Sequence, residues 1–267
     1  MLLKLRENFN QRLGMKVYLY STCLGQATLG ASAVSAAKLL TRCGAQVVYK
    51  KDQTCCGQPA FNTGYFDEAK EVALYNISLF GDGDEPILVA AGSCAGMMGH
   101  DYIELFKGSE HEEKARNFAS RCKEVSSFLN EHLELVDKGE PVKVSWHSNC
   151  HALRIAKSVE ASKSLLRKLS NVELIELERE EECCGFGGTF SIKEPEISNA
   201  MALAKIADIK KTGVKYLISG DGGCLLNING TLRRNNEDIK CIHLYDFLLA
   251  RLEGQSIDDK GVSDERK

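Results

Sequence analysis

Short apolar runs and amphipathic stretches alternate along this chain. The apolar runs predict buried strands at residues 16–21, 45–49, 86–91, 142–147, 172–177 and 215–219. The stretches between them carry apolar residues at helical spacing, and predict helices at residues 31–40, 67–80, 110–123, 126–135, 152–169, 198–211 and 243–252. Asp67 is the expected N-cap of one helix, and Gly44 and Gly213 are expected stop signals. Strands alternating with helices predict an α/β fold, with mostly parallel sheets flanked by helices.

The elements and the cysteines occur in the same order twice. Cys23, Cys55-Cys56-Gly57 and Cys94 in the first half correspond to Cys150, Cys183-Cys184-Gly185 and Cys224 in the second. The offsets between equivalent cysteines are 127, 128 and 130 residues. We therefore expect two duplicated lobes related by pseudo-two-fold symmetry. The expected divisions are an N-terminal extension at 1–14, cysteine-rich domains at 15–138 and 139–253, and a flexible tail at 254–267.

Composition argues against several classes of protein. The 267 residues carry a formal net charge of −3, which shows no bias toward nucleic acid. No apolar run approaches the roughly 20 residues of an integral membrane segment. The first 14 residues have scattered charges and no apolar centre, so a secretory signal is not expected. Eleven cysteines in such a chain argue against a disulfide scaffold and favour a reducing compartment, and the expected location is cytoplasmic.

The eight repeated cysteines are the candidate ligands of a metal or a cluster. They fall just after predicted strands, at the edge of a parallel sheet where ligands bind and toward which the following helices direct their N-termini. Iron–sulfur is the first candidate, because two adjacent thiolates bind one tetrahedral ion awkwardly but can reach two irons of a cluster. Zinc in one lobe is the alternative, since structural zinc also takes four thiolates. A vicinal disulfide at either Cys-Cys pair would need a strained ring.

Two histidines distinguish the second half from the first. His147 and His151 flank Cys150, whereas Tyr20 and Leu24 are their equivalents. Each histidine can be a metal ligand, a proton donor or an N–H···S contact beside the ligands, or an ordinary loop residue that makes a hydrogen bond. The sequence leaves these alternatives open.

Glycines and three further cysteines complete the candidates. Gly57 and Gly185 let the backbone approach the site closely and offer N–H donors to sulfur. Cys43, Cys122 and Cys241 have no evident partner in the repeat, and are expected to be small buried apolar residues. No catalytic residue is identified, since no Ser–His–Asp or HExxH pattern is present.

At the two Cys-Cys-Gly motifs the chain resembles the CCG-domain family, which includes the B subunit of heterodisulfide reductase and the glycolate oxidase iron–sulfur subunit. One branch, the lactate-utilisation protein A family, is similar over nearly the whole span from Met15 to about Leu252. The segments that carry this similarity are CCGQPAFNTGY, SCAGMM, NCH, CCGFGGTFS and GGCLLNINGTLRR.

The resemblance implies an iron–sulfur electron-transfer component of a multi-protein L-lactate oxidation system, and thus an oxidoreductase subunit. Its partners would be the other subunits of that system, including a ferredoxin-like iron–sulfur protein. Each half has four cysteines where heterodisulfide reductase has five. We expect a four-iron cluster in each lobe, or one cluster with the other lobe vacant or zinc-filled. The alternatives are a thiol–disulfide redox enzyme and a zinc-stabilised subunit without redox activity.

Overall fold

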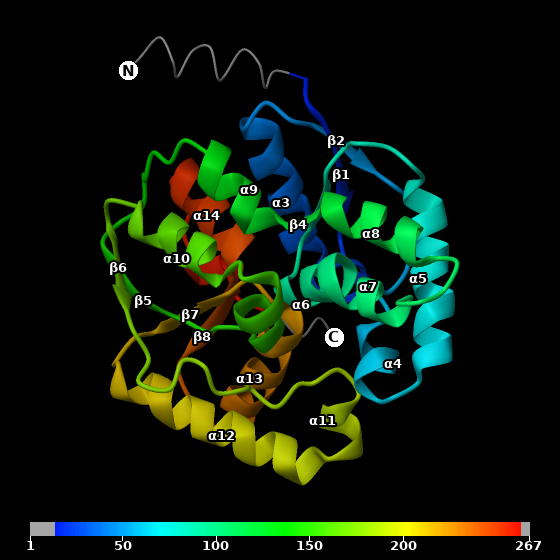
Figure 1. Ribbon diagram of the computed structural model, residues 1–267. Coiled ribbons are helices and arrows are strands. Elements are labelled where there is room, and N and C mark those ends of the chain that lie inside the picture. Colours follow the sequence, from blue (N-terminus) through cyan, green and yellow to red (C-terminus); the bar gives the residue numbers. More distant parts are fainter. Residues whose placement is uncertain (1–13, 263–267) are drawn as a thin grey trace.

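Two four-stranded sheets, each with all its strands parallel, organise the chain (Figure 1). The computed structural model describes residues 14–262, so most of the expected extension and the end of the expected tail lie outside the described residues. The first sheet has the order β2-β1-β3-β4, with β1 at Lys16–Tyr20, β2 at Gln46–Tyr49, β3 at Ile87–Val89 and β4 at Cys122–Glu124. The second has the order β6-β5-β7-β8, with β5 at Val142–Trp146, β6 at Val172–Ile175, β7 at Tyr216–Ser219 and β8 at Lys240–His243. The expected α/β fold with two duplicated lobes is confirmed.

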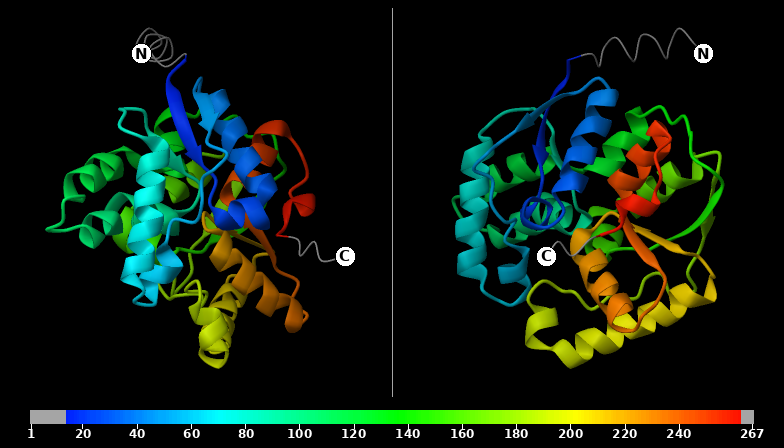
Figure 2. Two further views of the ribbon diagram at one scale, coloured as in Figure 1. Left: turned by 90° about the vertical axis from the view of Figure 1, so that its right-hand side faces the viewer. Right: turned by 180° about the vertical axis from the view of Figure 1, so that it is seen from behind.

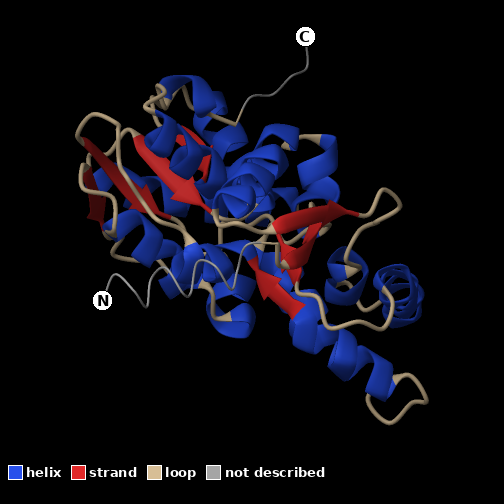
Figure 3. Cartoon of the chain, turned by 90° about the horizontal axis from the view of Figure 1, so that it is seen from above, coloured by secondary structure: helices blue, strands red, loops and turns tan. Residues whose placement is uncertain are grey.

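Helices flank both sheets (Figure 3). Those of the first half are α2 (Cys23–Ala27), α3 (Gly30–Arg42), α4 (Gln58–Asn62), α5 (Phe66–Phe80), α6 (Gly92–Gly96), the π-helical turn η1 (Met97–Asp101), α7 (Tyr102–Leu105), α8 (Glu112–Arg121) and α9 (Val125–His132). Those of the second half are the π-helical turn η2 (Ala152–Ala156), α10 (Val159–Arg167), α11 (Phe190–Lys193), α12 (Pro195–Lys211), α13 (Gly222–Arg234), α14 (Leu244–Glu253) and the short 3₁₀ turn η3 (Asp258–Lys260). No helix of the described residues is long and apolar enough to cross a membrane.

The inner faces of the two sheets share one hydrophobic core. Side chains alternate along a strand, so Val17 and Leu19 of β1 join the core beneath α3 and α9, while Tyr18 and Tyr20 face α5 and α8. The shared core also contains β5, α10 and α14. Helices α3 and α14 pack against each other and lie side by side in Figure 2. The two halves are therefore joined through their cores as well as their surfaces.

Polar contacts reinforce the same junction. The hydroxyls of Ser32 and Ser35 on α3 donate to the two carboxylate oxygens of Asp246 on α14, at 2.5 and 2.6 Å. All three residues are buried, so these charge-assisted bonds satisfy groups that water does not reach. At the exposed end of the two helices, Arg42 pairs with Glu253 at 2.6 Å. The relative position of the lobes is set by both apolar packing and directional bonds.

Strand register reveals an equivalence that the cysteine spacing hides. Ile87 of β3 pairs with Cys122 of β4, and Leu217 of β7 pairs with Cys241 of β8. These are corresponding positions of the two sheets, so the expectation that Cys122 and Cys241 lack a partner in the repeat is wrong. Their offset is 119 residues, because the connection before β8 is shorter than the one before β4. As expected, Cys241 is buried, as is Cys43, whereas Cys122 is only partly buried.

Several predicted elements needed correction. The helix predicted at 110–123 ends at Arg121, and the next three residues form β4, whose polar sequence CKE shows no apolar run. The helix predicted at 152–169 is broken at Lys157, where the backbone is left-handed with a φ of 51°. Apolar spacing continues across this turn, and for that reason the sequence predicted a single helix. Tyr65 rather than Asp67 occupies the N-cap of α5. The sequence did not predict the helices within residues 92–105 and 222–234, and it did not predict strand β8.

Candidate metal centre

The first cysteine quartet lies where three loops meet at the carboxyl ends of the first sheet. Thr22 caps α2 with its side chain, and Cys23 is the first residue of that helix. Cys55 and Cys56 immediately precede the left-handed cap of α4, and Cys94 lies in the first turn of α6. The Sγ atoms of Cys23 and Cys55 are 3.8 Å apart, and those of Cys56 and Cys94 are 3.3 Å apart. The loops therefore bring four thiols together.

The second quartet has the same construction. Cys150 follows β5, the Cys183–Cys184 pair follows the loop after β6, and Cys224 lies in the first turn of α13. The Cys183 thiol lies close enough to those of Cys150 and Cys184 to shift its pKa, and Cys184 is influenced in the same way by Cys183 and Cys224. In both quartets the second cysteine of the pair and the last cysteine are buried, while the other two are half-buried.

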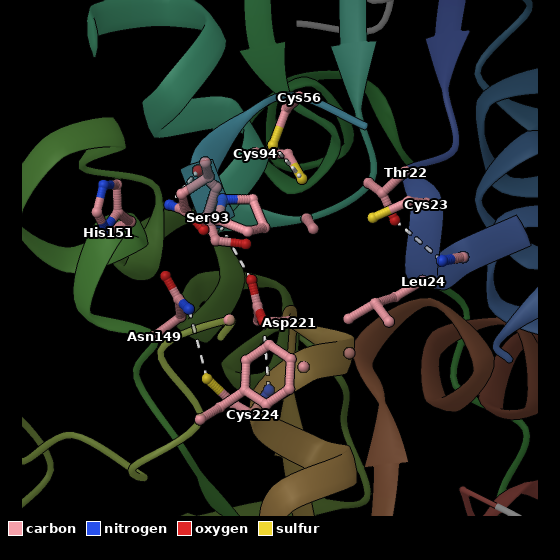
Figure 4. Close-up of a pocket in the computed structure, with 18 of the residues that line it drawn as sticks. Thr22, Cys23, Leu24, Cys56, Ser93, Cys94, Asn149, His151, Asp221 and Cys224 are labelled. Carbon is pink, nitrogen blue, oxygen red and sulfur yellow. Dashed lines mark hydrogen bonds between the residues drawn. The ribbon is translucent and has the colours of Figure 1, made fainter. Parts of the chain in front are cut away.

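Both quartets open onto one cavity between the lobes. Its volume is about 260 Å³, and all eight cysteines line it. Leu24, Leu29, Pro59 and Phe186 make much of the remaining wall apolar. Figure 4 shows thiols of the first quartet on one side of the cavity and Cys224 on the other, with Asp221 between them. The structure thus brings together every cysteine that the repeat singled out.

Glycines permit the close approach of the two lobes at this cavity. A Cβ atom at Gly92, which begins α6, would lie 2.5 Å from Ala152 Cβ of the other lobe. A Cβ atom at Gly222, which begins α13, would lie 2.1 Å from Leu29 Cδ1. Each cysteine-bearing helix therefore starts at a glycine because a residue of the opposite lobe lies against it.

The Cys-Cys-Gly turns need glycine for a different reason. Gly57 has a φ of 85° and Gly185 a φ of 86°, which is the left-handed region that other residues rarely adopt. Gly185 N also donates to Cys183 Sγ at 3.4 Å, which is the N–H donor to sulfur expected of this glycine. The turn directs both cysteine side chains toward the cavity and supplies an N–H group to sulfur.

The electrostatics of each quartet favour one thiolate. The hydrogen bond from the Cys23 thiol lowers the pKa of Cys55 to about 3, and that from Cys150 lowers the pKa of Cys183 to about 2. The same bonds, together with burial, raise the pKa of Cys23 and Cys150. The thiolate is the form of cysteine that binds metals. Four convergent thiols with an accessible thiolate fit a metal ion or a cluster.

The polar surroundings of the two quartets differ. His147, Asn149 and Asp221 surround the second quartet, and the duplicated positions in the first are Tyr20, Thr22 and Ala91. Asn149 Nδ2 donates to Cys224 Sγ at 3.4 Å, and Asn149 Oδ1 accepts from Ala152 N at 2.9 Å. The Thr22 hydroxyl instead caps its own helix by accepting from Gly25 N. The second quartet therefore has an amide that donates a hydrogen bond to sulfur. At the duplicated position, the first quartet has a hydroxyl that caps helix α2.

His147 is enclosed beside the second quartet. It is fully buried, and within the described part of the chain neither ring nitrogen has a hydrogen-bond partner. One of its nitrogens and the Sγ atoms of Cys184 and Cys224 all lie within 4.8 Å of one another. Burial lowers the pKa of His147 to about 3, and the Lys205 ammonium acts in the same direction.

His151 occupies a different position from His147. It lines the cavity, but its Nε2 lies 3.2 Å from Asp101 Oδ2, across the junction of the lobes. The other oxygen of Asp101 lies 2.9 Å from His100 Nδ1. His151 is thus a hydrogen-bonded loop histidine, which was one of the alternatives that the sequence left open.

Asp221 links the two quartets, and sequence reasoning missed it. Its Oδ2 accepts from Ser93 N at the start of α6, at 3.1 Å, and its Oδ1 accepts from Cys224 N at 3.4 Å (Figure 4). It is 3% exposed, so the carboxylate lies between the lobes away from water. Comparing the duplicated segments AAGSC and GDGGC, or STC and SNC, would have pointed to Asp221 and Asn149 as differences.

A known protein family matches both parts of the chain that carry the repeated cysteines. The family model described as "Cysteine-rich domain" and named CCG matches twice, at residues 17–99 and 144–229. The chain belongs to the CCG cysteine-rich domain family. The two matches coincide with the two sets of repeated cysteines, so the cavity lies between two CCG units.

Curated relatives extend the similarity over most of the chain. Proteins named Lactate utilization protein A from Oceanobacillus iheyensis and Shouchella clausii are 38% and 40% identical, over 90% and 88% of this chain and 99% and 98% of their own length. The expected resemblance to this branch of CCG proteins is confirmed. Among solved structures, a hypothetical protein from Helicobacter pylori matches with a TM-score of 0.67 at 11% identity. The alignment covers 96% of this chain and 55% of the Helicobacter pylori protein. At this low identity, the match shows that the two proteins share a fold and nothing about function.

Proposed function

We propose that this protein is an iron–sulfur electron-transfer component of a multi-protein L-lactate oxidation system. The observation that carries the proposal is the convergence of all eight repeated cysteines on one cavity. Cys23, Cys55, Cys56 and Cys94 hold one centre, and Cys150, Cys183, Cys184 and Cys224 hold the other. The name of the curated relatives supports the link to lactate utilisation.

The donor set supports clusters of the four-iron type. Each quartet offers four cysteine thiols, the ligand number of a [4Fe–4S] cluster. When bound, such clusters accept and release single electrons, whereas the conversion of lactate to pyruvate releases two. Two such centres on one cavity can together take up the two electrons that lactate releases.

The chain's own residues provide the surroundings of these centres. Cys56, Cys94, Cys184 and Cys224 are the buried members of the two quartets, so the protein shields these ligands from bulk water. Asn149 donates a hydrogen bond to a ligand sulfur, and Asp221 holds the two cysteine-bearing helices together. The sequence contains no nicotinamide or flavin fingerprint, so the hydride-accepting cofactor belongs to a partner. The partners are the other subunits of the system, including a ferredoxin-like iron–sulfur protein.

Metal analysis of the anaerobically purified protein tests the ligand assignment. We expect iron and acid-labile sulfide in the wild type, and Cys56→Ser and Cys184→Ser should each lose about half of the iron with the EPR signal of one lobe. Cys122→Ala is the matched control, since this cysteine lies in β4 and does not line the cavity. Unchanged iron in both serine variants would overturn the assignment, as would a reconstituted protein without iron or sulfide.

Electron transfer needs a separate measurement. With the partner subunits and L-lactate present, the EPR signal of the reduced clusters should appear, and it should be absent when lactate is omitted. Clusters that stay oxidised under these conditions, although dithionite reduces them, would contradict the electron-transfer role.

Zinc in the second lobe is a second candidate. The close grouping of His147, Cys184 and Cys224 favours it, because a single tetrahedral ion needs ligand atoms near one another. Zinc analysis of Cys56→Ser separates the two candidates. This variant retains the second quartet, and one equivalent of zinc without iron would identify a structural ion there.

A further inference from the structure

The backbone of His147 is fixed so that its side chain faces the thiols. Its N–H donates to Ile218 O at 2.9 Å, and its carbonyl accepts from Ser219 Oγ at 2.9 Å. Both partners belong to β7, so His147 is held directly after β5 at the carboxyl edge of the sheet. The imidazole is then enclosed with Cys184 and Cys224 by the fold itself.

Among residues 14–262, neither ring nitrogen of this imidazole has a hydrogen-bond partner. Burying a polar group without a hydrogen bond costs about 1–3 kcal/mol, and most native groups avoid that cost. The Lys205 ammonium donates to the carbonyls of Arg179 and Glu180 and makes no hydrogen bond to the imidazole. At the duplicated position in the first lobe, the Tyr20 hydroxyl donates to Thr54 O. The two lobes therefore differ: the first position is satisfied by the protein, and the second is not.

We propose that His147 is a nitrogen ligand of the metal in the second centre. Imidazole nitrogen binds both iron and zinc, and it commonly shares a metal with cysteine thiolates. His147 then replaces one of the four cysteines as a ligand of the second centre, so that centre has three sulfur ligands and one nitrogen ligand, whereas the first has four sulfur ligands. This inference rests on the proposed function, since it requires that the second quartet holds a metal.

Nitrogen ligation has a consequence for the two centres. Replacing thiolate ligands by histidine raises the reduction potential of an iron–sulfur centre, because a neutral donor stabilises the oxidised form less. The second centre should therefore accept electrons more readily than the first. Electrons entering at the first centre would move toward the second across the shared cavity.

Pulsed EPR on protein labelled with ¹⁵N-histidine tests the ligation. The full-length Cys55→Ser/Cys56→Ser variant leaves only the second centre to be loaded, with iron and sulfide under anaerobic conditions. We expect the reduced centre to show the large hyperfine coupling of a directly bound ¹⁵N nucleus. Adding His147→Cys should abolish that coupling and lower the midpoint potential, while a thiol remains at the position to support folding and loading.

His151→Gln in the same background is the matched control. His151 also lines the cavity, but its nitrogen is engaged by Asp101, so the coupling should persist. A loaded centre that shows only the weak coupling of an N–H···S contact would overturn the proposal, as would a coupling that survives in His147→Cys. If the second site holds zinc, X-ray absorption at the zinc edge should show one nitrogen among the ligands, and an all-sulfur shell would overturn the proposal.

The two proposals fail in different ways. A protein whose quartets bind neither iron and sulfide nor zinc contradicts the proposed function and this inference together. A second centre that loads and is reduced, but without bound nitrogen, contradicts this inference alone and leaves electron transfer intact.

Discussion

His147, Asn149 and Asp221 give the second quartet a polar environment that the first quartet does not have. Asp221 accepts from the backbone of a cysteine-bearing helix, and Asn149 donates to a cysteine sulfur. His147 is buried beside the thiols. Their counterparts in the first lobe are a tyrosine, a threonine and an alanine. Because hydrogen bonds and charges near the sulfur atoms set the potential of a cluster, duplicated folds can hold centres of different potential.

Asn149→Asp should lower the midpoint potential of the cluster that we propose for the second quartet. The aspartate retains an oxygen to accept from Ala152 N, but it loses the N–H group that donates to Cys224 Sγ and adds a negative charge. Both changes disfavour the reduced cluster. Redox titration followed by EPR measures the shift. Asn229→Asp is the control, since this amide donates to Val262 O outside the cavity, and an equal shift in the two variants would refute the explanation.

The helices that carry the last cysteine of each quartet depend on a close contact with the opposite lobe. Helix α6 begins where Gly92 lies against Ala152, and α13 begins where Gly222 lies against Leu29. Apolar periodicity did not predict these helices, because they start with glycines and small residues that are poor helix formers by themselves. The sequence predicted the longer helices α3, α5 and α12 well, since their apolar spacing is local and strong.

Gly92→Ala should destabilise the protein by about 1–3 kcal/mol, because the added methyl group overpacks the junction of the lobes. The Cβ atom would lie 2.5 Å from Ala152 Cβ and 3.3 Å from its Cα, so relief requires a movement of backbone. Urea denaturation measures the loss. Gly99→Ala places its Cβ no closer than 3.6 Å to any neighbour and should be nearly neutral. Equal stabilities for the two variants would contradict the proposed contact.

A buried network around Glu124 joins the two lobes. Glu124 ends β4, accepts from Ser126 N at 2.8 Å to cap α9, and accepts from the Tyr245 hydroxyl of α14. Ser162 of α10 donates to Ser126 Oγ at 2.7 Å. Burial raises the pKa of Glu124 to about 7, from an ordinary value of 4.5. The carboxyl group therefore couples the stability of the whole molecule to pH.

Glu124→Gln should flatten the fall in stability as pH rises. Between pH 4.5 and about 7 the folded protein keeps a proton on Glu124 that the unfolded chain has lost, so the stability present below pH 4.5 is lost as pH rises through the folded pKa. The wild type should lose up to ~3 kcal/mol more than the variant between pH 4 and pH 8. Urea unfolding across this range measures the difference. The exposed Glu113→Gln is the control, and parallel wild-type and Glu124→Gln curves would exclude the effect.

The sequence by itself determined the duplication, the eight thiols and the parallel α/β plan of each lobe. Cysteine spacing and apolar periodicity are properties of nearby residues, so they can be read along the chain. Fold class followed from them, and the resemblance to the CCG family came from the motif residues around the repeated cysteines. Strand β4 could not be predicted, since its three residues CKE contain no apolar run and are made a strand by their pairing with β3.

Only the tertiary structure decided how the two halves meet. The common cavity, the bond from Ser93 N to Asp221 and the unsatisfied imidazole of His147 all depend on residues far apart in sequence. Such contacts depend on how the shared core orients one lobe against the other, and no local pattern specifies that orientation. The sequence therefore predicted two similar cysteine sites, and packing placed them on one cavity with different surroundings.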